Sequence, residues 1–357
     1  MLDRLDRPLR DLRVSVTDRC NLRCRYCMPR EVYGEGFAFL DRSQLLSFEE
    51  IARVVTTAAN LGVRKLRPTG GEPLLRRELE RLVRMLAQID AIEEIAMTSN
   101  GLLLARKAHA LADAGLTRVT VSLDSLDDRV LREMADAPVS AQRVLAGIDA
   151  AIDAGLHPVK VNMIVRRGVN EACVSQMAAH FRERPVVLRF IEYMDVGASN
   201  GWRPEHVVPA TEILSSVEAR WPLQKLPRSA AGDVATRYRY RDGAGEIGVI
   251  HAVSEPFCGG CTRARLSADG KLFTCLFARA GHDLRELLRG GADEAELRDA
   301  LRGIWGARSD RYSAERGSRR VAERGALGED ALGGKAETTT SSQDGRPPRV
   351  EMSYIGG

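Results

Sequence analysis

Residues 12–29 read LRVSVTDRCNLRCRYCMP, a strand-like run of alternating polar and apolar residues followed by three cysteines. Cys20, Cys24 and Cys27 stand in a C-x3-C-x2-C spacing, so three thiolates in one loop can converge on one metal centre. Thiolate groups select zinc, copper(I) or iron–sulfur clusters. A closed zinc site needs four ligands, and the next histidine along the chain is His109. Three cysteines on a cubane cluster instead leave one iron open to a small molecule, which favours a reactive site.

The same loop resembles the signature of the radical S-adenosylmethionine enzymes, with Tyr26 directly before its last cysteine. In that superfamily the open iron of a [4Fe–4S] cluster chelates the amino and carboxylate groups of S-adenosylmethionine. An electron from the cluster then gives a 5′-deoxyadenosyl radical. The alternative is three unrelated cysteines or half of a zinc site. The motif alone indicates the superfamily and leaves the reaction open.

Length and composition restrict the class of protein. The 357 residues allow one large domain or two of ordinary size. A formal charge of +4, from 53 basic and 49 acidic residues, is too balanced to argue for nucleic acid. No signal peptide or run of membrane-spanning length is present, so no membrane partner is expected. Seven cysteines without a signal peptide indicate reduced thiols, and we expect a cytoplasmic protein.

From residue 11 to about residue 194, β-rich runs alternate with amphipathic segments, which indicates βαβ units and a parallel sheet. Six such units are too few for a closed eight-stranded barrel. We therefore expect an α/β fold with a partial (β/α)6 barrel over residues 1–200, as the superfamily resemblance also implies. The expected strands are Leu12–Thr17, Lys65–Thr69, Ile92–Thr98, Arg118–Ser122, Val159–Val165 and Val187–Ile191. The expected helices are Phe48–Leu61, Arg77–Ile89, Leu103–Ala114, Ala141–Ala154 and Asn170–Phe181.

The expected strands carry a polar stripe, although parallel strands covered on both faces usually read as continuous apolar runs. With a period of two, each strand can turn its polar residues inward and its apolar residues toward the helices. Buried cations are costly unless paired, so the stripe predicts an anionic ligand, and a triphosphate suits the number of cations. The alternative is that these charges lie at exposed strand ends. The cations are Arg13, Lys65, Arg67, Lys160 and Arg189.

The segment Thr69-Gly70-Gly71-Glu72-Pro73 follows the second expected strand. Paired glycines let backbone approach a ligand closely, and the segment resembles the family stretch that meets the methionine amino group. Pro68 departs from the family pattern, which has an aliphatic residue there. Proline is disfavoured inside sheets, so the direction of Arg67 stays open. The resemblance implies that S-adenosylmethionine is bound by Tyr26, Gly71, Ser122 and Met194.

The pattern changes beyond residue 200, where we expect a C-terminal α+β iron–sulfur domain over residues 201–327. Thr211–Arg220 is predicted to be helical, and Thr236–Tyr240 and Gly248–Val253 to be antiparallel strands. A turn at Asp269-Gly270 predicts a hairpin of 263–267 against 271–275.

That hairpin brings Cys275 back beside Cys258 and Cys261. A zinc site completed by His251 or His282 is the alternative for this group. Its pairing with the first cysteine group favours a second cluster with an open iron.

Both cysteine groups, together with 98–101, 121–124, 189–197 and the terminal Gly356-Gly357, resemble one family of radical S-adenosylmethionine lyases. That family converts GTP to (8S)-3′,8-cyclo-7,8-dihydroguanosine 5′-triphosphate in the first step of molybdenum cofactor biosynthesis. The resemblance implies two [4Fe–4S] clusters, on Cys20, Cys24 and Cys27 and on Cys258, Cys261 and Cys275. It implies GTP binding by Arg13, Lys65, Arg67, Thr98, Lys160, Arg189, Arg263 and Arg265, and catalytic roles for Arg263, Arg265, Gly356 and Gly357.

The end of the chain divides in two. Residues 328–348 are rich in Gly, Ala, Thr and Ser, which predicts a disordered linker. Residues 349–357 return to apolar and aromatic types, and the family's Gly-Gly tail reaches the active site. The alternative is a frayed terminus.

Two other functions stay open at this stage: a radical enzyme that modifies a peptide and uses an auxiliary cluster, and a non-catalytic metal- and nucleotide-binding protein. We expect GTP, an electron donor of unknown identity and a downstream pterin-forming enzyme as partners, with a homodimer as one candidate assembly. Cys173, on an expected helix, is interpreted as a small buried hydrophobe.

Overall fold

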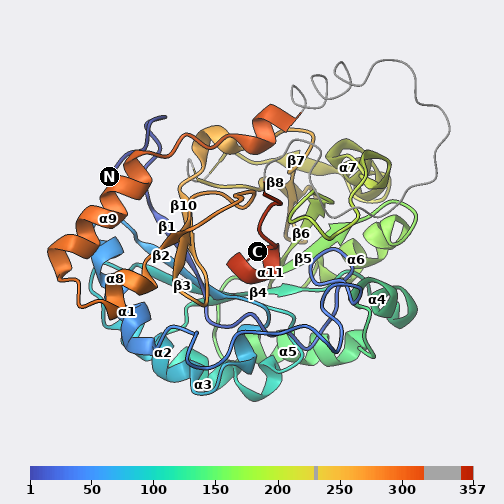
Figure 1. Cartoon of the computed structure of the whole chain (residues 1–357). Helices are drawn as coiled ribbons and strands as arrows, with labels where there is room; N and C mark the ends of the chain where they lie inside the picture. The colour runs from blue at the N-terminus through green and yellow to red at the C-terminus, as the bar shows by residue number, and fades with distance from the viewer. Residues whose placement is uncertain (229–231, 317–346, 357) are drawn as a thin grey trace.

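The strands expected in the first half of the chain form the centre of one curved sheet (Figure 1). The structure is a computed structural model that describes residues 1–228, 232–316 and 347–356. Three of the six strands have the expected bounds, and the others differ by one or two residues at their ends. The strands are β1 (Asp11–Ser15), β2 (Lys65–Thr69), β3 (Glu94–Ser99), β4 (Arg118–Ser122), β5 (Val159–Val165) and β6 (Val186–Glu192).

Strands from the C-terminal part of the chain extend this sheet at both edges. In the described residues the sheet has 12 strands in the order β12-β11-β10-β1-β2-β3-β4-β5-β6-β9-β8-β7. Strand β10 lies parallel to β1, and β9 lies parallel to β6. The C-terminal α+β part therefore shares the sheet of the partial barrel. Its strands are β7 (Leu223–Lys225), β8 (Thr236–Tyr240), β9 (Glu246–Ile250), β10 (Arg263–Leu266), β11 (Lys271–Phe273) and β12 (His282–Asp283).

Two predicted antiparallel pairs are confirmed: β8 with β9, and the hairpin of β10 with β11. Strand β9 begins two residues earlier than expected and ends at Ile250, because a turn at Gly245, with a φ of 124°, feeds Glu246 directly into the ladder with Arg239. The Asp269-Gly270 turn has the positive φ at Gly270, 89°, that such a reversal requires.

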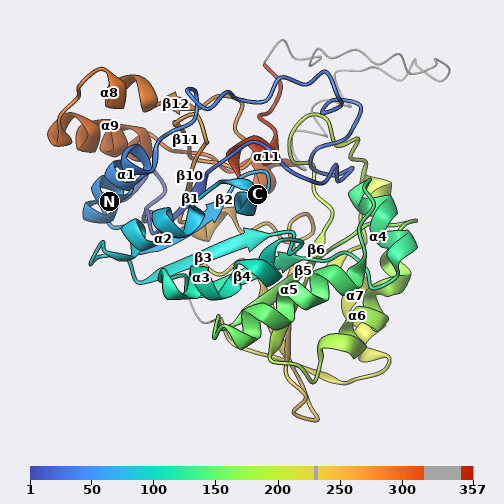
Figure 2. The same ribbon diagram turned by 90° about the horizontal axis from the view of Figure 1, so that it is seen from below.

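Helices cover the convex side of the sheet (Figures 1 and 2). Helix α1 begins with the capping box of Ser47 and Glu50. Helix α4 was not expected; it is a short helix whose first turn is capped by the Asp127 side chain, which accepts from the amide of Arg129. The helices of the first half are α1 (Phe48–Asn60), α2 (Leu79–Ala87), α3 (Ala108–Asp113), α4 (Asp128–Ala135), α5 (Ala141–Asp153) and α6 (Val174–Phe181).

The helices of the C-terminal part of the chain lie at three different places around the sheet. Helix α7 (Ala210–Glu218) packs on β6 and β9, while α8 (Arg285–Arg289) and α9 (Glu294–Gly306) lie on the side of α1. The short α11 (Met352–Ile355) lies on the concave side, within the curve of the sheet (Figure 1). No helix in the described ranges is long and apolar enough to cross a membrane.

The apolar stripes of the strands form the core beneath the helices. Leu12, Val14, Leu66, Val119 and Val121 are all at most 1% exposed and belong to the largest apolar cluster. Because side chains alternate along a strand, this burial turns the polar stripe to the concave side.

Pro68 is accommodated where the ladder between β2 and β3 has already ended. That ladder joins Lys65 to Glu94 and Leu66 to Ile95, and Pro68 pairs only with Val14 of β1. The missing proline N–H therefore leaves the strand intact, and Arg67 keeps its inward direction.

Candidate active site

A cavity of about 970 Å³ occupies the concave side of the sheet, and both cysteine groups line it. The first group follows the C-terminal end of β1, whereas Cys258 and Cys261 precede the N-terminal end of β10. Because β1 and β10 are parallel, the two groups lie at opposite ends of the cavity. The β10–β11 hairpin returns Cys275 to the end where Cys258 and Cys261 lie.

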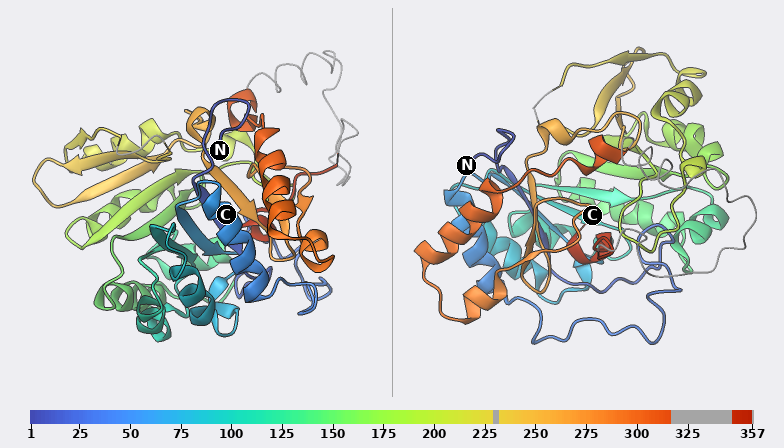
Figure 3. Two further views of the ribbon diagram at one scale, coloured as in Figure 1. Left: turned by 90° about the vertical axis from the view of Figure 1, so that its left-hand side faces the viewer. Right: turned by 45° about the horizontal axis from the view of Figure 1, so that its top comes forward.

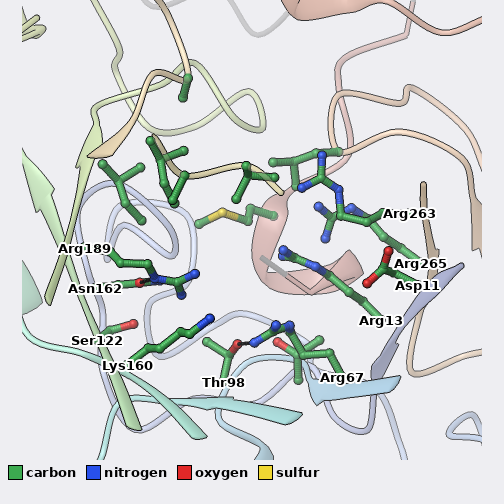
Figure 4. Close-up of a pocket in the computed structure, with 18 of the residues that line it drawn as sticks. Asp11, Arg13, Arg67, Thr98, Ser122, Lys160, Asn162, Arg189, Arg263 and Arg265 are labelled. Carbon is green, nitrogen blue, oxygen red and sulfur yellow. Dashed lines mark hydrogen bonds between the residues drawn. The ribbon is translucent and has the colours of Figure 1, made fainter. Parts of the chain in front are cut away.

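Four cations of the predicted stripe point into this cavity from β1, β2, β5 and β6 (Figure 4): Arg13, Arg67, Lys160 and Arg189. Lys65 also lines the cavity. Arg67 Nη1 lies 3.3 Å from Thr98 Oγ1 and 3.4 Å from Thr120 Oγ1. Arg189 donates from Nε to Asn162 Oδ1 at 2.9 Å and from Nη2 to Thr120 Oγ1 at 3.4 Å. These partners are neutral oxygens, so the hydrogen bonds leave the positive charges uncompensated.

Burial and mutual repulsion lower the pKa values of the cavity cations. Burial, followed by repulsion from neighbouring cations, lowers the pKa of Arg67 to about 10, of Arg189 to about 9 and of Lys160 to about 7. The pKa of Arg13 falls well below its usual value because of burial and then the charge of Arg265. An anionic ligand of high charge would relieve this repulsion.

The charges near the N-terminal ends of the strands are, by contrast, partly balanced. Lys65 is in register with Asp11 on one side and Glu94 on the other. Arg118 forms an ion pair with Glu94 and also lines the cavity. Arg118 was missed in the sequence, although a period of two from Ser122 and Thr120 would have placed it on the inward face.

Tyr26 connects the first cysteine loop to the end of β4. Its hydroxyl donates to Asp124 Oδ2 at 2.8 Å, and Asp124 Oδ1 accepts the amide of Ile164 at 2.9 Å. Burial raises the pKa of Asp124 to about 6. Burial also raises the pKa of the three thiols of this loop, that of Cys20 to about 11. Asp124 was not assigned a role from sequence, because its partner Tyr26 lies far away in the chain.

The glycine pair after β2 serves mainly to pack against the first cysteine loop. A Cβ at Gly71 would overlap the carbonyl oxygen of Arg19, and one at Gly70 would overlap that of Thr17. The Gly71 amide donates to Thr17 O at 2.8 Å. Close approach of backbone was expected toward a ligand; the structure shows it toward the loop, with Gly71 also lining the cavity.

Glu72 is buried, and its carboxylate accepts hydrogen bonds from neighbouring residues of the protein. Its carboxylate accepts from Ser99 Oγ at 2.8 Å and from the amides of Asn100 at 2.8 Å and Leu74 at 3.1 Å. Burial raises its pKa to about 7. Glu72 therefore joins the ends of β2 and β3 beside the first cysteine loop.

At the second cysteine group, Arg263 Nη2 lies 3.3 Å from Cys261 Sγ. Burial opposes ionisation of this thiol, but the charges of Arg263 and Arg308 lower the pKa of Cys261 to about 6. His251 and His282, the candidate zinc ligands, are not among the described residues that line the cavity. Across the described ranges no three or more His, Cys, Asp or Glu side chains are gathered tightly enough to hold a single metal ion.

The C-terminal tail enters the cavity region near β1 and β10. Arg265 Nη1 donates to the carbonyl of Gly356, and Ser15 Oγ donates to that of Tyr354 at 3.1 Å. A Cβ at Gly356, whose φ is 75°, would overlap the Thr69 side chain. Gly357 and residues 328–346 of the expected linker lie outside the described residues.

The structure thus brings nearly all predicted site residues to one cavity. Besides the six cysteines, the cavity is lined by Arg13, Tyr26, Lys65, Arg67, Gly71, Thr98, Ser122, Lys160, Arg189, Met194, Arg263 and Arg265. Cys173, as expected, is buried away from it, with Ser125 Oγ 3.4 Å from its sulfur. The six cavity cysteines are unpaired thiols in two groups of three, a donor set that suits iron–sulfur clusters.

Comparisons with known proteins agree with this arrangement. The model of the Radical SAM superfamily matches residues 14–181, and that of Molybdenum Cofactor Synthesis C matches residues 186–314. A GTP 3′,8-cyclase of Acidothermus cellulolyticus is 53% identical over 369 residues, covering 99% of this chain and 98% of that protein. A GTP 3′,8-cyclase of Staphylococcus haemolyticus is 46% identical over 356 residues, covering 99% and 98%. The crystal structure of Streptococcus suis SuiB has a TM-score of 0.55 at 12% identity, over 84% of this chain and 65% of that one, and shows the fold alone.

Proposed function

The chain belongs to the family of GTP 3′,8-cyclases, and we propose on that premise that it converts GTP to (8S)-3′,8-cyclo-7,8-dihydroguanosine 5′-triphosphate. This is the first step of molybdenum cofactor biosynthesis. The observation that supports GTP as the substrate is the set of partly buried cavity cations that have no hydrogen-bonded carboxylate. In particular, the hydrogen bonds of Arg67 and Arg189 go to neutral oxygens. A triphosphate supplies the negative charge that these residues lack.

The first cysteine group would hold a [4Fe–4S] cluster, and Tyr26, Gly71, Ser122 and Met194 would contact S-adenosylmethionine beside it. When bound, these groups supply a 5′-deoxyadenosyl radical. The second cysteine group would hold another [4Fe–4S] cluster beside the purine. Two donor sets at opposite ends of one cavity support this division of roles.

The chain's own residues would bind and orient GTP between those ends. Arg13, Arg67, Lys160 and Arg189 would neutralise the triphosphate, and Thr98 would position it. Lys65 would contribute less, because Asp11 and Glu94 flank it in register. Arg263 and Arg265 would line the reacting end, with the tail excluding water there.

The proposal is tested by anaerobic incubation of the reconstituted chain with GTP, S-adenosylmethionine and dithionite. We expect an isomer of GTP, separated by chromatography, and transfer of deuterium from the ribose 3′ position to 5′-deoxyadenosine. Cys20→Ala should abolish both, whereas Cys173→Ala, at the buried cysteine outside both groups, should retain both.

Other outcomes would identify the alternatives. Untouched GTP beside abundant 5′-deoxyadenosine would mean a different substrate, such as a peptide. Zinc at the second group without a visible chromophore there would mean a metal- and nucleotide-binding protein without turnover.

The remaining partners follow from the chemistry proposed. An external electron donor must reduce the first cluster, and a downstream pterin-forming enzyme must consume the product. A reducing compartment, the cytoplasm, suits free thiols, and a homodimer is one assembly to be tested by light scattering.

A further inference from the structure

Two buried arginines bind the backbone of the second cysteine group from distant parts of the chain. Arg7 Nη1 donates to the carbonyl of Cys258 at 3.0 Å. Arg308 Nη1 donates to the carbonyl of Cys261 at 2.8 Å. Arg7 precedes β1 and Arg308 follows α9, and Figure 3 shows these two segments side by side. Neither arginine was assigned a role from sequence.

Asp3 lies between the two guanidinium groups. Its Oδ2 accepts from Arg7 Nε at 2.7 Å and lies 3.4 Å from Arg308 Nη1. The side chains of Arg7, Arg308 and Asp3 are 2%, 1% and 0% exposed. Buried charges require good geometry and further hydrogen bonds, and here the cysteine carbonyls accept part of them. We call these three residues the Arg7–Asp3–Arg308 clamp.

The surroundings fix both arginines in place. Trp305 Nε1 donates to the Arg7 carbonyl at 3.1 Å, and the Arg308 guanidinium carbon lies 4.5 Å from the Trp305 ring centroid. Arg7 Nη1 also donates to the carbonyl of Asp310 at 2.8 Å. Asp310 Oδ2 accepts from Thr274 Oγ1 at 2.6 Å, directly before Cys275. The network therefore reaches all three cysteines of the group.

The clamp also brings two guanidinium groups to the cavity wall. Arg7 and Arg308 line the cavity; the Asp3 carboxylate lies between them, and Asp310 Oδ2 lies 3.5 Å from Arg308 Nε. Arg7 Nη2 is buried and has no hydrogen-bond partner in the part of the chain that the structure describes. A buried donor of this kind is costly unless a bound group satisfies it.

We propose that the Arg7–Asp3–Arg308 clamp positions the second cysteine group for its cluster and stabilises the negative charge of that cluster. The inference rests on the proposed function, in which Cys258, Cys261 and Cys275 hold the second cluster. It adds positioning residues that lie outside both cysteine motifs. The segment they hold has only a single 3₁₀ turn, Cys258–Gly260, of its own, so side-chain contacts must fix its geometry.

The clamp acts on one cysteine group only. The first group is fixed by other contacts: Arg23 Nη1 donates to the carbonyl of Cys20 at 2.9 Å, and the Arg23 and Arg25 amides donate to the α4 end at Ala135 and Met134. Loss of the clamp is therefore expected to loosen the second cluster and spare the first.

The experiment uses the reconstituted full chain, an iron chelator and iodoacetamide under anaerobic conditions, with the alkylation rate of each cysteine followed by mass spectrometry. In Arg7→Gln and Arg308→Gln we expect alkylation of Cys258, Cys261 and Cys275 to accelerate about tenfold, since a charge-assisted hydrogen bond is lost. The rates at Cys20, Cys24 and Cys27 should match wild type.

Arg4→Gln is the matched control, because Arg4 is exposed and its substitution removes the same charge from the same segment. In this variant the alkylation rates of both cysteine groups should match wild type. Arg7→Lys, which keeps the charge but cannot bridge Asp3 and two carbonyls, should give an intermediate rate. Equal acceleration at both cysteine groups, or none at the second, would overturn the clamp.

The failure of the proposed function is recognised separately. If wild-type Cys258, Cys261 and Cys275 are alkylated at once without chelator, they carry no cluster, and the second cluster site itself is wrong. If these cysteines are protected until iron is removed, but are alkylated in Arg7→Gln and Arg308→Gln at the wild-type rate, the second cluster is supported and the role of the clamp is refuted.

Discussion

Lys160 is the cavity cation whose charge is most sensitive to pH near neutrality. Burial, followed by repulsion from Arg189, Arg118 and Arg67, lowers its pKa to about 7. The free cavity therefore carries this charge only part of the time at neutral pH. A bound triphosphate would favour the charged form and raise the pKa again.

GTP affinity is therefore predicted to depend on pH through Lys160. Above pH about 7 the free lysine is mostly neutral, so GTP binding must take up a proton. The affinity should fall up to about tenfold per pH unit there and level off at lower pH, where the lysine is already charged. Lys160→Arg should flatten the profile. Anaerobic calorimetry in buffers of different ionisation enthalpy counts the proton, and a count of zero would contradict the assignment.

At Gly71 the prediction concerns steric overlap. Gly71→Ala places a Cβ against the backbone oxygen of Arg19, which must shift the first cysteine loop. We expect a loss of about 1–3 kcal/mol in the free energy of unfolding and loss of iron from the first group. Chemical unfolding and iron analysis measure both. Gly303→Ala, where a Cβ meets nothing within 4 Å, is the control and should lose neither stability nor iron.

At the scale of elements, Glu192 joins the barrel to the C-terminal part of the chain. It ends β6, is fully buried, and accepts from the amides of Ala210 at 2.8 Å, Val253 at 2.7 Å and Ser254 at 2.8 Å. Ser254 Oγ donates to it at 2.6 Å. One carboxylate thus connects β6, the start of α7 and the segment after β9.

Glu192→Gln should weaken the contacts among β6, α7 and the segment after β9 and lower the free energy of unfolding. The amide replaces an acceptor with a donor that faces backbone N–H groups, and we expect a cost of about 1–3 kcal/mol in unfolding free energy. Ser254→Ala, which removes one donor and leaves the amides paired, should cost about 1 kcal/mol or less. Guanidinium unfolding compares the two variants; equal stability of Glu192→Gln and wild type would refute the role.

At the scale of the whole molecule, the segment 352–356 returns to the barrel, and Met352 and Ser353 line its cavity. Helix α11 lies within the curve of the sheet (Figure 1). It is held there by Ser15 of β1 and Arg265 of β10, two neighbouring strands. The tail thereby lies at the C-terminal ends of β1 and β2, on the side of the cavity where the first cysteine group lies.

Gly356→Ala is predicted to displace the tail, because the new Cβ overlaps Thr69 and the backbone has a positive φ. Misplacement of about 1 Å near the reacting end costs turnover on the order of 100-fold, whereas GTP affinity should change far less. Gly243→Ala has a similar positive φ of 84° but meets nothing within 4 Å, so it controls for backbone strain. Equal turnover in the two variants would exclude a role for the tail.

Much of the fold and of the candidate site could be predicted, because the sequence patterns that indicate them span only a few residues. The alternation of Arg13, Arg67 and Lys160 with apolar neighbours predicted a cationic cavity, and the cysteine spacing predicted two metal groups. Arg118 obeyed the same period and was overlooked. Asp124, Glu192 and Arg7 could not be assigned, because their roles depend on partners far away in the chain.

By itself, then, the sequence determined the six strands of the first half, their polar faces and the hairpin at Asp269-Gly270 that returns Cys275, since each depends on neighbours a few residues apart. Only the tertiary structure decided that β9 and β10 join the barrel sheet, that the cysteine groups face each other across one cavity, and that Asp3 lies between Arg7 and Arg308. Those arrangements depend on which surfaces pack together, and packing is set by the whole chain at once.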